Sequence, residues 1–156
     1  MDQWFLVPQN TDKLKIYMLY RKKAIRLVSL SIRYAYSDTL FLANNVLNLP
    51  DLIKYDKLCF MHKLRYLYLP KSFNNILHLK SEIGESRVRS DVGNFLIPPN
   101  KTGILFPLLE AAKDWNALPY HLKSIANISN FKSEVKGFLL NNYSTECTVT
   151  DCFTCT

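Results

Sequence analysis

Three cysteines near the C-terminus are the residues best suited by type and spacing to bind a metal. Cys147, Cys152 and Cys155 form a C-x4-C-x2-C pattern, and C-x2-C is a frequent spacing of zinc ligands. A closed structural zinc site needs a fourth ligand, which only a residue distant in sequence, such as His121, could supply. The pattern therefore favours a loose tail over residues 144–156 with exposed thiols. Zinc is the weaker alternative, and no cofactor is predicted.

The motifs of common enzyme classes are absent from the sequence. There is no G-x-S-x-G nucleophile motif, no glycine-rich phosphate-binding loop and no Asp-Asp pair for two-metal catalysis. His62 falls on a predicted buried helix, and His78 and His121 fall near predicted helix ends, which is more typical of structural histidines than of bases. Cys59 is predicted to be a buried core residue. The sequence therefore predicts that this chain is not an enzyme by itself.

The positive charge of the chain is concentrated in one segment. The 156 residues include 20 Lys and Arg against 13 Asp and Glu, which gives a net charge of +7. Residues 13–33 contain seven of the basic residues and no acidic one, so the rest of the chain is neutral. An excess confined to one segment marks a candidate surface for binding a polyanion.

The basic segment is predicted to form one amphipathic helix over residues 13–33. Thr11 or Asp12 is a suitable N-cap, and neither Gly nor Pro interrupts the segment. On a helix, four basic residues fall within about 40° of one another; they are Lys15, Lys22, Arg26 and Arg33. The opposite side is apolar and is expected to pack on neighbouring helices; it contains Ile16, Tyr17, Tyr20, Ala24, Leu27 and Val28, widened by Leu14, Ile25 and Ile32. Arg21 lies inside this apolar arc and must extend to solvent or meet an acidic partner.

Three interpretations of this helix are open. The first is an amphipathic helix whose Lys and Arg face is simply solvated. The second is a helix that binds the phosphate backbone of a nucleic acid, with an affinity that falls steeply as salt rises. The third, a helix on a membrane surface, is disfavoured because the apolar side is rich in Tyr and other helices are available to cover it. The second interpretation assigns nucleic-acid contacts to Lys15, Lys22, Lys23, Arg26 and Arg33 and secondary contacts to Arg87 and Arg89.

The remaining segments predict a mainly α-helical domain over residues 13–143, between a lead-in over 1–12 and a Cys- and Thr-rich tail over 144–156. The spacing of apolar residues and the positions of Pro and capping residues predict a series of helical segments. They are a short helix from Ser37 or Asp38 through Ala43, a central buried helix over 51–68, one or two turns over 71–79, and helices over 108–118 and 129–142. A small β-hairpin near 94–106 would pair residues 95–97 with 104–106.

Composition and hydropathy exclude several classes of protein. With 48% hydrophobic residues, 4 Gly and 7 Pro, most of the chain is neither intrinsically disordered nor collagen-like. No run of 18 apolar residues predicts a membrane span, and residues 1–9 lack the basic start and the cleavage site of a signal peptide. The expected location is the cytoplasm or the nucleus.

Short strings at six places along the chain carry a family resemblance. They are 21–26 (RKKAIR), 46–52 (VLNLPDL), 60–63 (FMHK), 69–73 (LPKSF), 115–119 (WNALP) and 131–143 (FKSEVKGFLLNNY). In this order they resemble the C-terminal region of reverse transcriptases of jockey-like non-long-terminal-repeat retrotransposons, downstream of the polymerase fingers and palm. The chain departs from the family pattern at Tyr36, Thr39 and Ala111, and it contains neither the paired aspartates of a polymerase nor an endonuclease domain.

The resemblance implies a non-catalytic piece of an RNA-directed DNA polymerase that binds template RNA, primer duplex or target DNA without sequence specificity. The upstream polymerase domain would be a further partner. In the WNALP string, Trp115 is expected to anchor the hairpin region to a helix that Asn116 and Pro119 end; stacking of Trp115 on a base is the alternative. The competing hypothesis for the whole chain is a structural or protein-interaction domain from a decayed element.

Overall fold

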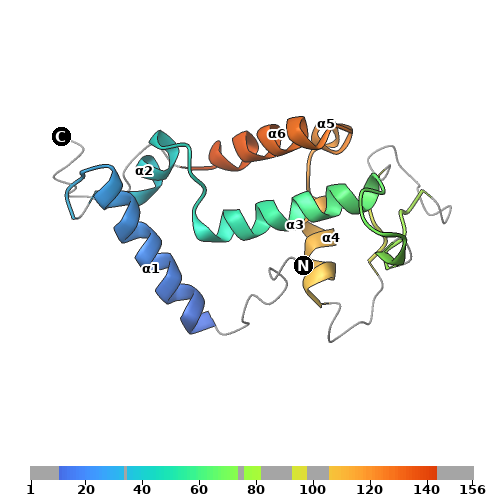
Figure 1. Cartoon of the computed structure of the whole chain (residues 1–156), viewed down its shortest axis with the longest axis horizontal. Coiled ribbons are helices and arrows are strands. Elements are labelled where there is room, and N and C mark those ends of the chain that lie inside the picture. Colours follow the sequence, from blue (N-terminus) through green and yellow to red (C-terminus); the bar gives the residue numbers. More distant parts are fainter. Residues whose placement is uncertain (1–10, 34, 74–75, 82–92, 98–105, 144–156) are drawn as a thin grey trace. The chain divides into compact units, whose positions relative to one another are not determined.

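The structure, a computed structural model, describes residues 11–33, 35–73, 76–81, 93–97 and 106–143. These residues form six α-helices and no β-strand (Figure 1), which confirms the prediction of a mainly α-helical protein. The helices are α1 (Thr11–Val28), α2 (Ser37–Ala43), α3 (Leu49–Arg65), α4 (Phe106–Asn116), α5 (Tyr120–Lys123) and α6 (Ile128–Leu140), with a 3-10 helix η2 (Lys71–Phe73) after α3. Over this part of the chain, no helix combines the length and the apolar character that crossing a membrane requires.

The chain divides into two compact units. The first comprises Met1–Leu52 and Lys136–Thr156, and the second comprises Ile53–Val135. The first unit contains α1 and α2, the second contains α4 and α5, and the boundaries fall within α3 and α6. The basic segment and the WNALP string therefore belong to different units.

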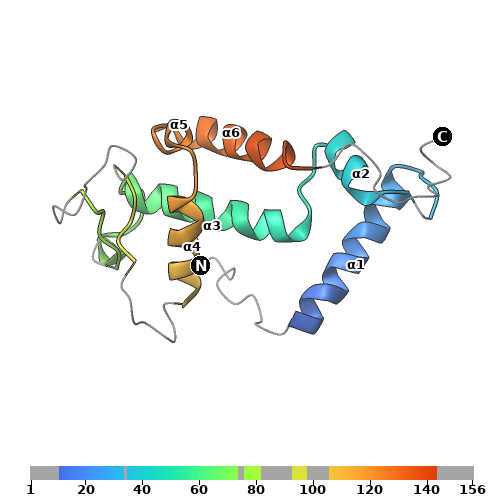
Figure 2. The same ribbon diagram turned by 180° about the vertical axis from the view of Figure 1, so that it is seen from behind.

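In the first unit, α2 packs against the C-terminal part of α1, as both views show (Figures 1 and 2). Phe41 of α2 is only 2% exposed. Just after α2, the side-chain amide of Asn44 donates to the Ser29 hydroxyl at 2.9 Å. The burial of Phe41 and this hydrogen bond fix α2 to the end of α1, and the predicted short helix is confirmed.

The start of α3 is held by a cap and by a tyrosine from the end of the chain. The side-chain oxygen of Asn48 accepts the backbone N–H of Asp51 at 2.9 Å, which is an N-cap bond. The backbone N–H of Asn48 donates to the Tyr143 hydroxyl at 2.7 Å. Burial raises the pKa of Tyr143 above its usual value. Tyr143, the last residue of the family-like strings, thus ties the segment after α6 to the start of α3.

The second unit is built around an aromatic core. His62 of α3, Trp115 of α4, Phe131 of α6 and Phe95 are each 2% exposed or less. The ring centroids of His62 and Phe131 lie 4.3 Å apart, and Trp115 lies 5.7 Å from Phe131 and 6.1 Å from Phe95. The predicted central helix corresponds to α3, whose buried residues all lie in its C-terminal half; they are Leu58, Cys59, Met61, His62 and Leu64.

Helices α1, α2 and α3 end in the same way, with one residue in the left-handed region. These residues are Leu30 (φ 49°), Asn45 (φ 53°) and Leu67 (φ 58°). In each case the next N–H bonds to a carbonyl five residues back; the pairs are Ser31 to Arg26, Val46 to Phe41 and Tyr68 to Lys63, all at 2.9 Å. This is the Schellman C-cap, which usually has Gly in the left-handed position. A side chain there costs about 1–2 kcal/mol, so two of the three turns retain a strained leucine.

The described pairing of residues 94–96 differs from the predicted hairpin. Phe95 forms an isolated antiparallel bridge with Leu79, and the backbone N–H of Leu96 donates to the His78 carbonyl at 2.8 Å. The helical assignment of residues 71–79 is therefore wrong at Leu79 and holds for η2. Of the predicted partner strand, 104 and 105 lie outside the described residues, and Phe106 begins α4.

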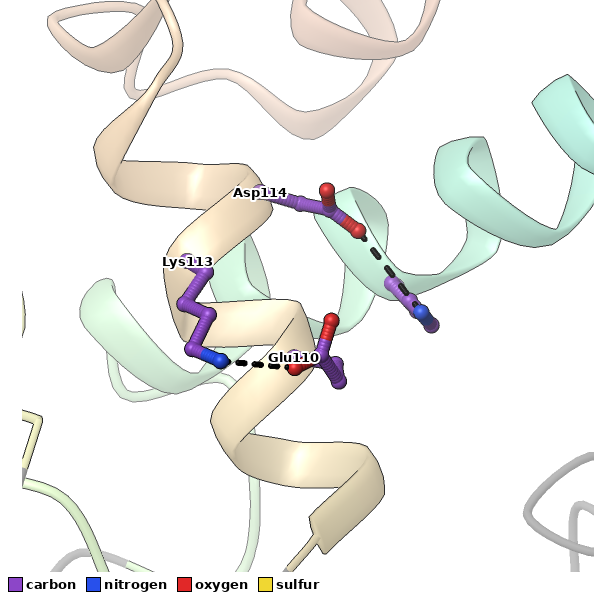
Figure 3. A network of polar contacts seen from close by, with 4 residues as sticks. Glu110, Lys113 and Asp114 are labelled. Atoms are coloured by element: carbon purple, nitrogen blue, oxygen red, sulfur yellow. Dashed lines mark hydrogen bonds and ion pairs between the residues drawn. The ribbon is translucent and has the colours of Figure 1, made fainter.

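Two ion pairs involve side chains of α4 (Figure 3). The Lys113 ammonium lies 2.8 Å from the Glu110 carboxylate on the same helix. The Asp114 carboxylate lies 3.7 Å from the ammonium of Lys57 on α3, and both of these side chains are about one-third exposed. Half-exposed pairs contribute about 0–1 kcal/mol. Lys57 and Lys113 therefore each have a carboxylate as a neighbour.

Candidate nucleic-acid interface

Helix α1 ends at Val28, so the prediction of one helix over residues 13–33 is wrong for its last five residues. The Schellman turn at Leu30 stops the helix, and Arg33 lies exposed in the segment that follows. The Arg26 Nε donates to the carbonyl of the buried Ala35 at 3.0 Å. The chain beyond the turn therefore folds back against the end of α1, and Arg33 is no longer in line with the other basic residues.

The side of α1 that packs is a stripe that includes an arginine. Leu14, Met18, Arg21 and Ile25 follow the i, i+4, i+7, i+11 spacing of one helix face. Ile25 is 6% exposed and the other three are half-buried. The Arg21 Nη2 donates to the carbonyl of the buried Leu47 at 2.9 Å. A backbone carbonyl thus satisfies the guanidinium, instead of the solvent or the acidic partner that the sequence suggested.

The predicted packing side of α1 is exposed, which is the main correction to the sequence analysis. Ile16, Tyr17, Tyr20, Leu27 and Val28 are between 51% and 76% exposed. Only Ile25, from the edge of the predicted arc, is buried. The helix is rotated so that the narrower stripe is the more buried side and the side richer in large apolar residues is exposed.

The predicted basic residues of α1 fall into two groups. Lys15 and Lys23 are exposed, whereas Lys22 and Arg26 are half-buried. The Lys15 ammonium lies 3.5 Å from the Asp12 carboxylate, and both side chains are more than 70% exposed, so that pair is easily opened by a stronger anion. The secondary candidates Arg87 and Arg89 lie outside the described residues. The cationic face is therefore less continuous than predicted.

Sequence reasoning missed Lys13, which is also exposed and extends the cationic surface toward the start of α1. We call Lys13, Lys15 and Lys23 the exposed lysine set. Helix α1 carries six basic residues and one acidic residue, Asp12. Several ammonium groups along one helix create a positive potential that attracts polyanions. The signal that would have placed Lys13 outside the packed side is the stripe of Leu14, Met18 and Ile25, whose centre lies about 120° from Lys13 around the helix axis.

Trp115 is enclosed and hydrogen-bonded. It is fully buried, and its Nε1 donates to the Gly93 carbonyl at 2.9 Å. The Arg65 guanidinium donates to the same carbonyl at 3.0 Å, and an added Cβ at Gly93, whose φ is +85°, would overlap that guanidinium. These contacts are those of an anchor between α4 and the segment at residues 93–95. With no exposed area, the ring of Trp115 has no face available for a base.

Asn116 ends α4 and pairs with the backbone of Phe95 on both sides. The Asn116 Oδ1 accepts the Phe95 N–H at 2.8 Å and its Nδ2 donates to the Phe95 carbonyl at 2.9 Å. Pro119 follows and caps the short helix α5. Sequence reasoning missed Lys123, which is 3% exposed and donates to the Asn94 side chain and to the Asn116 carbonyl, both at 2.8 Å. Nothing in its sequence context distinguishes Lys123 from a surface lysine.

His62 is a structural residue of the second unit. Its Nε2 lies 2.7 Å from the Ile125 carbonyl oxygen, so Nε2 carries the proton and donates. In the described part of the chain its Nδ1 has no hydrogen-bond partner. Burial lowers the pKa of His62, the bond to Ile125 opposes this effect, and the charge of Arg65 adds to it. The ring is therefore held neutral in the core.

Within the described ranges, no three His, Cys, Asp or Glu side chains lie together in a way that would hold a metal ion. The zinc candidates Cys147, Cys152 and Cys155 lie outside those ranges. Cys59 is buried, and burial raises the pKa of its thiol. A thiol with a raised pKa is protonated at neutral pH and a poor nucleophile.

The exposed lysine set of α1 is the one functional candidate that these observations leave in the described part of the chain. No family model, curated protein or solved structure matches the sequence.

Proposed function

We propose that this chain is a non-catalytic C-terminal segment of a reverse transcriptase of the jockey-like non-long-terminal-repeat type, and that it binds nucleic acid without sequence specificity. The proposed ligands are template RNA, primer duplex or target DNA. The parent protein would be an RNA-directed DNA polymerase that works in the cytoplasm or the nucleus and catalyses the reaction in an upstream domain. The observation that carries the binding proposal is the exposed lysine set of α1.

The proposal of ancestry rests on the ordered strings, and the structural roles of their residues support it. Trp115 and Asn116 of the WNALP string bind the backbone of residues 93–95, and Tyr143 bonds to the start of α3. Arg21 and Ile25 of the RKKAIR string form part of the packing stripe of α1. Residues that hold a fold together are those that chains of common descent are expected to share.

The proposal of binding rests on the electrostatics of α1. Each ammonium group that neutralises a phosphate releases a condensed counterion, and this release drives binding of any sequence. Lys13, Lys15 and Lys23 are exposed on one helix, and the Lys15 ammonium lies 3.5 Å from the carboxylate of the exposed Asp12. A surface of this kind contacts phosphates and reads no bases. Low specificity is therefore the expected behaviour.

The test replaces Lys13, Lys15 and Lys23 together by Gln in the full chain. Binding to a labelled RNA strand and to a labelled DNA duplex is measured by fluorescence anisotropy over a range of salt concentrations. We expect affinity at low salt to fall about tenfold or more. For the duplex, the slope of the logarithm of the binding constant against the logarithm of the salt concentration should become less steep by about 0.9 for each lysine that contacts a phosphate. Lys22 and Arg26 are less suitable targets because both are half-buried and Arg26 holds the Ala35 carbonyl.

The matched control replaces three exposed lysines on other elements, Lys71, Lys113 and Lys132, by Gln. This variant has the same net charge as the α1 variant. It should retain nearly all of the affinity and of the salt dependence. If the two variants weaken binding equally, net charge and not the α1 surface drives binding, and the proposal is wrong.

A second candidate function is favoured by the exposed apolar side of α1. Ile16, Leu27 and Val28 are 51%, 76% and 72% exposed, and a cluster of exposed apolar residues is typical of a protein-binding surface. A structural or protein-interaction domain of this kind would have little affinity for heparin or RNA. If the unmodified chain binds heparin and the α1 lysine variant does not, the nucleic-acid function is favoured over this alternative.

A further inference from the structure

The exposed side of α1 combines two tyrosine rings with two ammonium groups. Tyr17 and Tyr20 are 59% and 63% exposed, and residues three apart are neighbours on a helix surface. Lys13 and Lys23 fall within about 60° of Tyr20 around the helix axis. The Lys23 ammonium lies 5.9 Å from the centroid of the Tyr20 ring, which is a cation–π distance. Aromatic faces and positive charges thus alternate on one surface.

We propose that this surface binds single-stranded nucleic acid, with unpaired bases stacked on Tyr17 and Tyr20 and the flanking phosphates at Lys13 and Lys23. This inference rests on the proposed function and names its ligand class. Lysines alone would suffice for a duplex, whose bases are stacked inside and whose outer surface is phosphate. Exposed aromatic faces add a contact that only unpaired bases can use. Every base has such a face, so the contact preserves low sequence specificity.

The position of the lysines argues against a membrane surface as the ligand. A membrane-surface helix is disfavoured by the sequence partly because other helices could cover the apolar side of α1. The large apolar residues on that side are exposed, so this reason does not hold. Lys13 and Lys23 nevertheless lie among the apolar residues of the exposed side, between Leu19 and Tyr17 around the axis. An amphipathic membrane helix keeps its charges on the opposite face. Insertion of this side into a lipid layer would pull two ammonium groups toward the acyl chains.

The positive charge of α1 also argues against an uncharged protein groove. Helix α1 carries six basic residues and a single acid, and Lys13 and Lys23 are exposed on the side that carries the tyrosines, so the complementary partner is a polyanion. Ile16 and Leu27 fall close to Tyr20 around the axis and are exposed. The ligand that satisfies both the charge and the rings is a single strand.

The test compares two double variants of the full chain. In the first, Tyr17 and Tyr20 are both replaced by Leu, which keeps apolar area and removes the rings. In the second, both are replaced by Phe, which keeps the rings and removes the hydroxyls. Affinities for an oligouridine strand, an oligothymidine strand and a DNA duplex are measured at equal salt. Circular dichroism and thermal unfolding establish that both variants remain folded, as expected for exposed positions.

We expect the unmodified chain to bind the single strands more tightly than the duplex. The Leu variant should lose about tenfold in single-strand affinity for each ring removed, with duplex affinity unchanged, and the Phe variant should bind as the unmodified chain does. Equal affinity of the Leu variant and the unmodified chain for single strands overturns the inference, as does an equal loss on both ligands. The proposed function survives either result if the α1 lysine variant is still weakened.

Vesicles that contain phosphatidylserine provide the remaining arm of the test. Co-sedimentation of the chain with vesicles, without binding to the oligonucleotides, would assign this surface to a membrane and overturn both the inference and the proposed function. Binding to neither ligand would also overturn both. Binding to oligonucleotides with a loss confined to the Leu variant and to single strands supports the inference.

Discussion

Replacement of Leu30 by Gly tests where α1 ends. Leu30 is in the left-handed region and is 95% exposed, so its side chain contributes almost no burial. Gly removes a conformational cost of about 1–2 kcal/mol in the folded chain. It also makes the unfolded chain more flexible, which lowers stability by about 0.4–1 kcal/mol and partly offsets this gain. The variant should therefore be more stable than the unmodified chain by about 0.5–1 kcal/mol.

Leu27→Gly is the matched control for this prediction. Leu27 is 76% exposed and lies three residues earlier, inside α1. Gly inside a helix is less favourable by about 1 kcal/mol, so this variant should be destabilised. The two identical changes are thus expected to shift stability in opposite directions.

Urea unfolding followed by far-ultraviolet circular dichroism measures both effects, as shifts of the midpoint at constant slope. If the helix continued to Arg33, as the sequence predicts, Leu30 would be an interior helical residue. Leu30→Gly would then destabilise the chain about as much as Leu27→Gly. That result would show that the Schellman turn does not form and that Arg33 is in line with the other basic residues.

Two further predictions concern the second unit. His62 has a lowered pKa in the folded chain, so below its ordinary value of about 6.5 the unfolded chain binds the proton preferentially. The contribution of His62 to stability should therefore be fully present above about pH 7, and the free energy of unfolding should fall by at most about 1.4 kcal/mol per pH unit on acidification. In the His62→Phe variant, urea midpoints measured across this pH range should fall less steeply. Asn116→Asp places a carboxylate oxygen against the Phe95 carbonyl, where Nδ2 now donates. It should cost about 1–3 kcal/mol at neutral pH, and an unchanged melting temperature would show that the Asn116 bonds are dispensable.

Helices whose burial follows from a single apolar stripe could be predicted from the sequence. In α6, Phe131, Val135 and Leu139 occur at i, i+4 and i+8, and all three are 1% exposed or less. No other side of that helix offers a comparable apolar stripe, so the pattern has one solution. In α2 the buried residues are Ser37 and Phe41.

The orientation of α1 could not be predicted, because two of its sides are apolar. The side with Tyr17, Tyr20 and Leu27 has more apolar residues than the stripe with Leu14, Met18 and Ile25, so counting favours the wrong one. The narrower stripe can pack because its arginine, Arg21, has a hydrogen-bond partner there, a carbonyl 26 residues away in the chain. No local pattern contains that information.

Helix ends at leucine were also beyond the reach of sequence patterns. Gly or Asn is the usual mark of a left-handed C-cap, and Asn45 fits that rule. Leu30 and Leu67 do not, because their conformation is imposed by the packing of the neighbouring segments and not by their own preference. The candidate binding surface on the basic segment stays a prediction. Its composition changed, because the rotation of α1 exposes Lys13 and the tyrosines.

The guanidinium of Arg21 selects one of two rotations of α1 about its axis. With an aliphatic residue at this position, both apolar sides of α1 would lack a charged group that distinguishes them, and burial of either side would remove apolar area from water. In the observed rotation the guanidinium reaches the Leu47 carbonyl. In the other, that carbonyl would lose its donor. One charged residue thus distinguishes two apolar sides of the same helix, and the side that it leaves exposed to solvent is the one with the aromatic rings.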